Sequence, residues 1–152
     1  MLFRDVDKDF ERNVKEAFAF ISSSAAPKVV HSYYHEQAFG NALVELEGDN
    51  VRVRVTRDRG QIAVDLAPRG CKDWFIEYVV LQSVGVDSNV LLDLSDRTVE
   101  QAAKPIKANF EAITHAFGRE NWKATEADLE ARLERRGKEL EVLLFSPRGT
   151  KQ

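Results

Sequence analysis

Residues Phe39–Ala67, FGNALVELEGDNVRVRVTRDRGQIAVDLA, decide the fold of this 152-residue chain. Within this stretch apolar side chains alternate with polar ones in three consecutive runs, a period of two that is typical of half-buried strands. The runs are separated by two segments with hairpin-turn composition, Gly48-Asp49-Asn50 and Asp58-Arg59-Gly60. The stretch therefore predicts three antiparallel strands with a valine-rich inner face.

The same pattern predicts how the strands pair, because a shift of one residue would turn the valines to the opposite face. Keeping inward residues opposite one another pairs Val44 with Val53, and Val53 with Val64. On the outer face, this register predicts one arginine flanked by two acids: Arg52 between Glu45 and Asp65. A cross-strand charge pair of this kind contributes about 0.2–1 kcal/mol.

Apolar residues at helical spacing predict helices on both sides of the three strands. The expected helices are an amphipathic one over about Asp5–Ser22, a buried one from the cap Asp73 past Leu81 to Gly85, a third from Ser95 or Asp96 to Gly118, and a charged one capped at Thr125–Asp128 and weakened by Gly137. Pro105 either kinks the third helix or marks its start. Val90–Leu94 is a short apolar run, and Val29–Glu36 is either a fourth strand or a connection.

The expected fold is therefore α+β, with a three-stranded or four-stranded antiparallel meander, an N-terminal helix and about three helices after the sheet. No repeat or long linker divides the sequence, so residues 1–152 are expected to form one domain with a frayed tail at 146–152. A strand at the sheet edge, either Ile62–Leu66 or the first one, could pair with another copy of the chain.

The composition of the chain excludes or disfavours several classes of function but does not identify one. The net charge of −3 disfavours a dedicated nucleic-acid binder. A single cysteine, Cys71, excludes an internal disulfide and a multi-cysteine zinc site. Neither a signal-peptide pattern nor an apolar run of about 20 residues is present. We therefore expect a cytoplasmic protein with no membrane segment, cofactor or metal.

One histidine cluster, His31 to His35, surrounds Tyr33 and Tyr34. On a helix the two histidines would share a face and could hold a metal, but the sequence has no His-Glu-x-x-His pattern. A segment packed on the sheet is the simpler interpretation, and the tyrosines also suit a protein contact. An enzyme built on these histidines or on Cys71 would need a pocket lined by them.

Four arginines lie on one hairpin, at Arg52, Arg54, Arg57 and Arg59. They could bind an anion or a nucleic acid, although pairing with strand carboxylates is favoured because the chain is acidic overall. Of the two tryptophans, Trp74 is expected to anchor its helix in the core. Trp122 is expected either to be exposed for recognition or to form a hydrophobic staple with the last helix.

The block from Phe39 through Gln61, together with Asp73-Trp74-Phe75, resembles small uncharacterised bacterial proteins that are loosely grouped with immunity proteins of polymorphic toxin systems. The resemblance covers Phe39 to about Leu81 and implies an α+β fold and a toxin-neutralising role, without assigning any residue to a site. Immunity proteins are often acidic, because complementary charge speeds encounter with basic toxins.

The leading hypothesis is a non-catalytic, immunity-like domain that binds another protein, such as a toxin. Its expected contact residues are Tyr33, Tyr34, Arg57, Arg59 and Trp122. The alternative is an anion- or nucleic-acid-binding module that uses the arginine-rich hairpin.

Overall fold

The computed structural model describes residues 2–35, 40–87 and 97–145, and the side chains of 8–35, 40–87 and 97–139. Its elements, in chain order, are α1 (Leu2–Ala17), a 3₁₀ turn (Ala19–Ile21), β1 (Lys28–His35), β2 (Asn41–Glu47), β3 (Val51–Asp58), β4 (Gln61–Pro68), β5 (Phe75–Ile76), α2 (Glu77–Ser83), α3 (Val99–Ala108), α4 (Phe110–Ala116) and α5 (Trp122–Phe145). The predicted tail at 146–152, the run Val90–Leu94 and the helix start at Ser95 or Asp96 lie outside the described residues. None of the described helices is long and apolar enough to cross a membrane.

The α+β class and the antiparallel meander are confirmed, but the sheet is larger than predicted. It contains five described strands in the order β1-β2-β3-β4-β5, so each strand pairs with the next one along the chain. β1 resolves the ambiguous Val29–Glu36 segment as a strand. β5 replaces the start of the predicted second helix, because Phe75 pairs with Leu66 and is buried. Helix α2 therefore begins at Glu77, and Asp73 does not cap it.

The predicted pairing register is wrong by two residues in both hairpins. Val44 lies opposite Val55 rather than Val53, and Val53 lies opposite Leu66 rather than Val64. A shift of two keeps the inner face inward, so the alternating pattern could not detect it.

Turn geometry sets the register of the second hairpin. Asp58 pairs with Gln61, which leaves a two-residue turn. Both turn residues have positive φ, +53° at Arg59 and +81° at Gly60, as a type I′ turn requires. The predicted register instead implies a turn at Asp58-Arg59, and the observed turn lies one residue later, where Gly60 readily adopts positive φ.

The arginine between two acids on the outer face is therefore Arg54, not Arg52. Arg54 lies opposite Glu45 on β2 and Asp65 on β4. Its Nε and Nη2 atoms donate hydrogen bonds to Asp65 Oδ2 over 3.1 Å and 2.9 Å. The predicted row of charged pairs is therefore present, but its central arginine is the next outward-facing residue of β3, two positions further along the strand.

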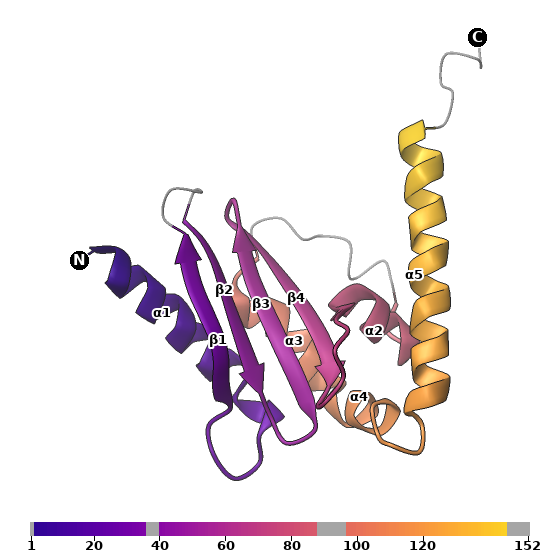
Figure 1. Cartoon of the computed structure of the whole chain (residues 1–152), viewed down its shortest axis with the longest axis horizontal. Helices are drawn as coiled ribbons and strands as arrows, with labels where there is room; N and C mark the ends of the chain where they lie inside the picture. The colour runs from indigo at the N-terminus through magenta and orange to yellow at the C-terminus, as the bar shows by residue number, and fades with distance from the viewer. Residues whose placement is uncertain (1, 36–39, 88–96, 146–152) are drawn as a thin grey trace.

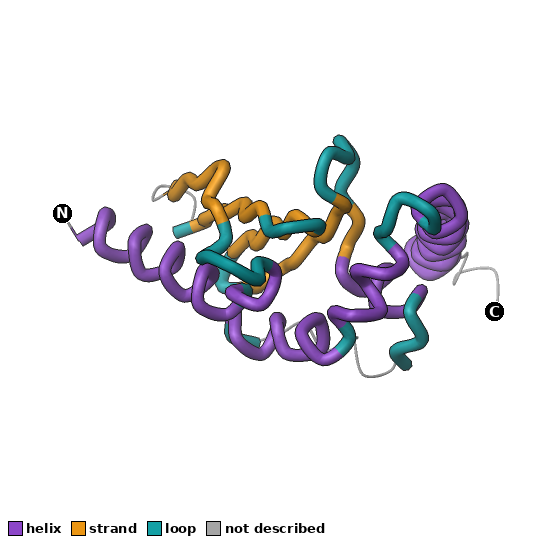
Figure 2. The backbone as a smooth tube through the Cα atoms, turned by 90° about the horizontal axis from the view of Figure 1, so that it is seen from below, coloured by secondary structure: helices purple, strands orange, loops and turns teal. Residues whose placement is uncertain are grey.

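Helices α1 and α3 cover the inner face of the sheet, and in Figure 1 α3 lies behind the strands. The chain seen along the sheet in Figure 2 has two layers, with these helices on one side. The core consists of the inward residues of β2, β3 and β4 packed against apolar residues of the helices, including Phe10, Val14, Phe18, Ala102 and Ile106.

Helix boundaries differ from the prediction where short tight turns intervene. The first helix ends at Ala17, and a 3₁₀ turn follows that brings Ile21 into the core. The third predicted helix is divided at Asn109 into α3 and α4, and Pro105 lies inside α3 rather than at its start. The last helix begins at Trp122, three residues before Thr125, because Thr125 N–H already donates to the Asn121 carbonyl.

Helix α3 is capped by Thr98, the residue directly before its first helical residue, Val99. Thr98 Oγ1 accepts a hydrogen bond from the Gln101 N–H over 3.0 Å, and Gln101 Oε1 accepts one from the Thr98 N–H over 2.8 Å. This reciprocal pair is a capping box, which satisfies two backbone donors that the helix itself leaves unpaired.

Candidate functional site

The outer face of the sheet is not covered by any described helix (Figures 1 and 2). Residues of β2 and β3 that point to this side are half-buried, whereas the inward residues between them are fully buried. This side of the sheet is therefore accessible among the described residues, and its two ends differ in chemistry.

At the β3–β4 end, Trp74 covers the arginines of β3. The Arg52 guanidinium lies 4.2 Å and the Arg54 guanidinium 4.8 Å from the centroid of its ring. Such cation–π contacts contribute about 0.5–2 kcal/mol, depending on desolvation. Arg52 also donates a hydrogen bond to the carbonyl oxygen of Cys71. The prediction that Trp74 anchors a helix in the core is therefore wrong; it closes one end of the outer face.

The remaining hairpin arginines occupy two different environments. Arg57 belongs to the inner face, where its Nε and Nη2 atoms donate to the Gly40 carbonyl over 3.2 Å and 3.0 Å. Its guanidinium also lies 4.7 Å from the centroid of the Phe10 ring. Arg59 is exposed at the turn, and its backbone N–H donates to Asn41 Oδ1. Three of the four arginines are thus engaged within the chain, so the hairpin does not form a shared cationic surface.

At the other end of the outer face lies β1, the edge strand. Tyr33 and Tyr34 point to opposite faces because they are adjacent in a strand. Tyr33 pairs with Leu43 on the outer face and is 44% exposed, whereas Tyr34 pairs with the buried Ala42 and is half-buried. Of the two predicted tyrosine contacts, only Tyr33 is accessible on this face.

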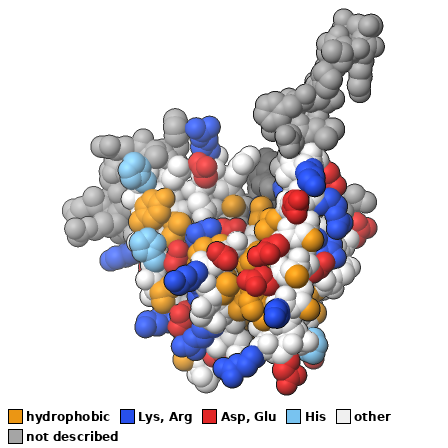
Figure 3. All heavy atoms as spheres, turned by 45° about the vertical axis from the view of Figure 1, so that its right-hand side comes forward, with side chains coloured by type: hydrophobic (Ala, Val, Ile, Leu, Met, Phe, Trp, Pro, Cys, Tyr) orange, Lys and Arg blue, Asp and Glu red, His pale blue; other side chains and the backbone are white. Residues whose placement is uncertain are grey.

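Among the described side chains, the two exposed large hydrophobic residues are Val30 at 43% and Tyr33 at 44%, and both belong to β1. Val30 lies where the pairing register shifts between Val29 and His31, as in a β-bulge. Together with neighbours on the outer face they form what we call the β1 surface: Val30, His31, Tyr33, His35 and Leu43. Apolar side chains gather beside histidines on the sheet side of the molecule in Figure 3.

The β1 surface was only partly predictable. The tyrosines were identified from composition, but Val30 was not, because the bulge that exposes it interrupts the alternation of β1. Of the two strands predicted as possible sheet edges, the first one is the edge. β1 has no further strand beside it among the described residues, whereas β4 pairs with β5 at Asp65 and Leu66.

The histidines do not form the helix-based metal pair. His31 and His35 lie on a strand, where four residues span about 13 Å, too far for one ion. Cys71 lies beyond β4, at the other end of the five-stranded sheet. The structure therefore does not bring these three residues into one pocket, as an enzyme built on them would require.

Trp122 is packed rather than freely exposed. Its ring lies 5.7 Å from the Phe75 ring and 5.4 Å from the Phe117 ring, in edge-to-face geometry in both cases. It connects the start of α5 to β5 and to the end of α4. The five predicted contact residues therefore do not converge: Tyr33 lies on the outer face, Tyr34 and Arg57 on the inner face, Arg59 at a turn and Trp122 beside α5.

Two further groups of ionisable side chains lie elsewhere. Glu77, 3% exposed, forms an ion pair with Arg97, which also donates to the Ile62 carbonyl over 3.0 Å and 2.6 Å. Burial raises the pKa of the Glu77 carboxyl above its ordinary value of 4.5, although Arg97 opposes the rise. The second group, Cys71, Asp73 and Glu126, presents three potential metal-ligand atoms within 4.8 Å of one another.

Comparison with family models, with curated proteins and with solved structures gives no match for this chain. Its function is therefore argued from its own surface.

Proposed function

We propose that this chain is a non-catalytic protein-binding domain that contacts another protein through the β1 surface and the free edge of β1. The observation that carries the proposal is the location of the exposed apolar residues: Val30 and Tyr33, both more than 40% exposed, lie on β1, the longer of the two edge strands of the described sheet.

Two properties of β1 support a protein as the ligand. An edge strand offers unpaired backbone N–H and carbonyl groups, to which an extended segment of a partner can add as a further strand. Tyrosine supplies a large contact area with little loss of side-chain entropy, and it is enriched among residues that dominate binding energy. Tyr33 therefore has the chemistry of an anchor, and Val30 extends its apolar area along the strand.

The neighbouring polar groups would supply orientation. His31 lies opposite Glu45, and its ring is 6.2 Å from the Tyr33 ring. His35 lies opposite Asn41 at the other side of Tyr33. An aromatic anchor between hydrogen-bonding groups is the usual arrangement of an interface centre with a polar rim.

Site-specific photo-crosslinking tests the proposal in the cells from which the sequence originates. A photoreactive phenylalanine analogue at position 33 is expected to form an adduct with one protein partner. The same analogue at position 104 serves as a control, because Lys104 is also exposed but lies on α3, on the opposite layer. No adduct at position 33, or the same adducts at both positions, would overturn the proposal.

With the captured partner purified, Tyr33→Ala is expected to weaken binding at least about tenfold, the effect of losing roughly 1.4 kcal/mol at an anchor. Tyr33→Phe keeps the ring and is expected to retain most of the affinity. An arginine variant, Arg59→Ala, should leave the affinity within about twofold, because Arg59 lies at the β3–β4 turn, two strands from β1, and only its backbone N–H contacts Asn41.

Toxin neutralisation is the finer form of this proposal, and it rests on the sequence resemblance and on the acidic net charge of −3. Co-expression with a toxin encoded beside the gene should restore growth of the host, and Tyr33→Ala should reduce that protection. Growth arrest that persists with the wild-type chain would remove the toxin as partner while leaving protein binding open to the crosslinking test.

A further inference from the structure

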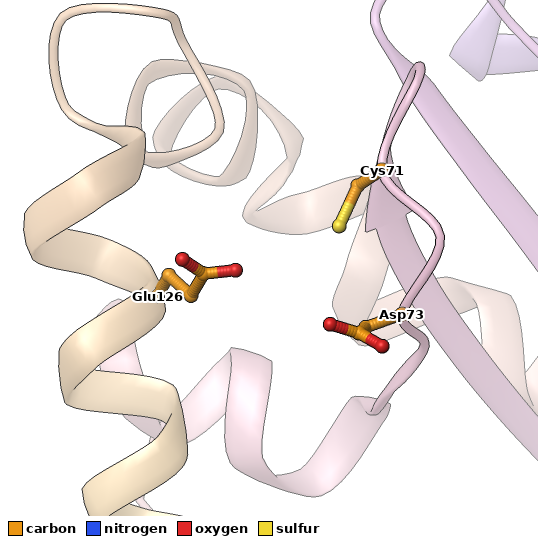
Figure 4. Close-up of side chains that lie close together, drawn as sticks. All are labelled: Cys71, Asp73 and Glu126. Carbon is orange, nitrogen blue, oxygen red and sulfur yellow. The ribbon is translucent and has the colours of Figure 1, made fainter.

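Three side chains that the proposed function does not use converge between the β4–β5 connection and the first turns of α5. They are Cys71, Asp73 and Glu126, and their potential ligand atoms all lie within 4.8 Å of one another. In Figure 4 the Cys71 sulfur and the two carboxylates point toward a common space from two elements. More than 50 residues separate Asp73 from Glu126 in the sequence, so only the folded chain brings these groups together.

Within the described part of the chain, the proximity of the two carboxylates is not explained by an ion pair with a basic side chain. None of the ion pairs found within the described part of the chain includes Asp73 or Glu126. Two like charges and a thiol placed face to face gain stability if a cation lies between them, because the cation replaces repulsion by attraction.

The backbone that carries these ligands is fixed by packing. The Cys71 N–H donates to the Pro68 carbonyl over 3.1 Å, and its own carbonyl accepts from Arg52. Asp73 adjoins Trp74, which is held by two arginines. Glu126 lies one helical turn after Trp122, whose ring contacts Phe75. The ligands thus project from segments that are positioned without any metal.

We propose that Cys71, Asp73 and Glu126 form a binding site for a thiophilic divalent cation of the Zn²⁺ class. One thiolate and two carboxylate oxygens give three protein ligands and leave a fourth tetrahedral position for water. Sulfur ligation favours Zn²⁺ over Mg²⁺ and Ca²⁺, which prefer oxygen alone.

The geometry is close to what such an ion requires. Zn–S and Zn–O bonds of about 2.3 Å and 2.1 Å place tetrahedral ligand atoms about 3.6 Å apart. Starting from separations of up to 4.8 Å, side-chain rotations that move the atoms roughly 1 Å closer complete the site. The bound ion would link the β4–β5 connection to α5. This structural role of the ion is independent of protein binding at β1.

Cobalt(II) titration of the purified, reduced full-length chain tests the site, because Co²⁺ takes Zn²⁺ positions and reports its ligands in its absorption. The wild-type chain is expected to show a sulfur-to-cobalt charge-transfer band that Zn²⁺ removes by competition. Cys71→Ser should abolish the band, and Asp73→Asn or Glu126→Gln should weaken Co²⁺ binding at least about tenfold, since each removes a ligand.

Glu130→Gln is the matched control, because Glu130 lies on α5 one turn beyond Glu126 and is exposed. It should leave Co²⁺ affinity unchanged. In addition, saturating Zn²⁺ should raise the melting temperature of the wild-type chain and not that of Cys71→Ser. No charge-transfer band in the wild-type chain would overturn the proposal. So would a band whose Co²⁺ affinity is unchanged in both carboxylate variants, since the thiol would then bind metal alone.

Discussion

Gly48 allows two segments to meet more closely than any other residue would permit. A Cβ at this position would lie 2.2 Å from the Ile21 carbonyl oxygen and 2.8 Å from its carbonyl carbon, and backbone atoms of this kind cannot rotate away. The contact is held by neighbouring bonds: Asp49 N–H donates to the Ile21 carbonyl, and Asp49 Oδ2 accepts from Ser23 N–H over 2.9 Å. Because Gly48 has no side chain, the 3₁₀ turn that ends at Ile21 can pack directly against the β2–β3 turn.

Substitution of two glycines by alanine is expected to change stability in opposite directions. Gly48→Ala should reduce the free energy of unfolding by about 1–3 kcal/mol, because the new methyl group forces Ile21 away. Gly137→Ala should raise it by about 0.5–1 kcal/mol, because Gly137 lies within α5 with nothing within 4 Å of an added Cβ. Urea unfolding of both variants measures this; a loss of stability of equal size in both would contradict the packing explanation.

The Glu77 carboxyl is expected to make stability depend on pH. Because burial raises its pKa in the folded state, the folded chain binds this proton more tightly than the unfolded chain does. The contribution of this group to the free energy of unfolding therefore falls as the pH rises from its ordinary pKa of 4.5 through the folded value.

Urea unfolding at a series of pH values from about 4.5 to neutrality should show this slope in the wild-type chain and a smaller one in Glu77→Gln. Glu120→Gln removes an exposed carboxyl and should keep the wild-type slope. Parallel curves for the wild-type chain and Glu77→Gln would show that Glu77 titrates alike in both states.

At the scale of elements, the sequence predicted which residues face inward more reliably than which residues pair. Alternation assigned Val44, Val53 and Val64 to the inner face, and all three are fully buried. Pairing depends instead on turn geometry, and a shift of two residues preserves every face assignment. β5 could not be predicted, since two residues carry no period. Its formation depends on the long-range burial of Phe75 against β4.

A double-mutant cycle distinguishes the observed register from the shifted one. Arg54 and Asp65 should show a coupling of about 0.2–1 kcal/mol in the free energy of unfolding, as expected for a partly exposed cross-strand ion pair. Arg52 is the comparison, because it lies opposite Ala67. It should show a smaller coupling with Asp65, since the two residues are connected only through Trp74 and Arg54. Coupling of Asp65 with Arg52 in place of Arg54 would contradict the observed pairing.

At the scale of the whole molecule, α5 joins the rest of the chain through few aromatic and aliphatic contacts. Trp122 packs on Phe75 and Phe117, and Leu129 is fully buried. Farther along, the Arg136 guanidinium lies 4.4 Å from the centroid of the Tyr78 ring. Beyond this contact α5 extends away from the sheet and the other helices (Figure 1).

Truncation of Trp122 should therefore loosen α5 before it affects the sheet. Trp122→Ala is expected to cost about 2–4 kcal/mol, somewhat less than for a fully buried tryptophan. Amide hydrogen exchange should accelerate in α5 while the amides of β3 keep more of their protection. Lys123→Ala, at the exposed neighbouring position, should leave both rates unchanged. Equal acceleration in α5 and β3 would indicate that α5 opens only with global unfolding.

Sites assembled from distant residues were beyond what the sequence could predict. Tyr33 was identified because tyrosines are conspicuous, whereas Cys71 gave no indication that Asp73 and Glu126 lie beside it. Local patterns report on faces of single elements, and the approach of α5 to the β4–β5 connection depends on packing between residues far apart in the chain.

The strand order has a consequence for how the chain folds during its synthesis. Each strand pairs with the one made just before it, so the sheet needs only short loops to close and can form within milliseconds to seconds. About 40 further residues, or roughly 2–8 s of translation, separate the end of β4 from the end of α3. During that interval α1, which is synthesised before the sheet, can already shield the valine face from water and from other nascent chains.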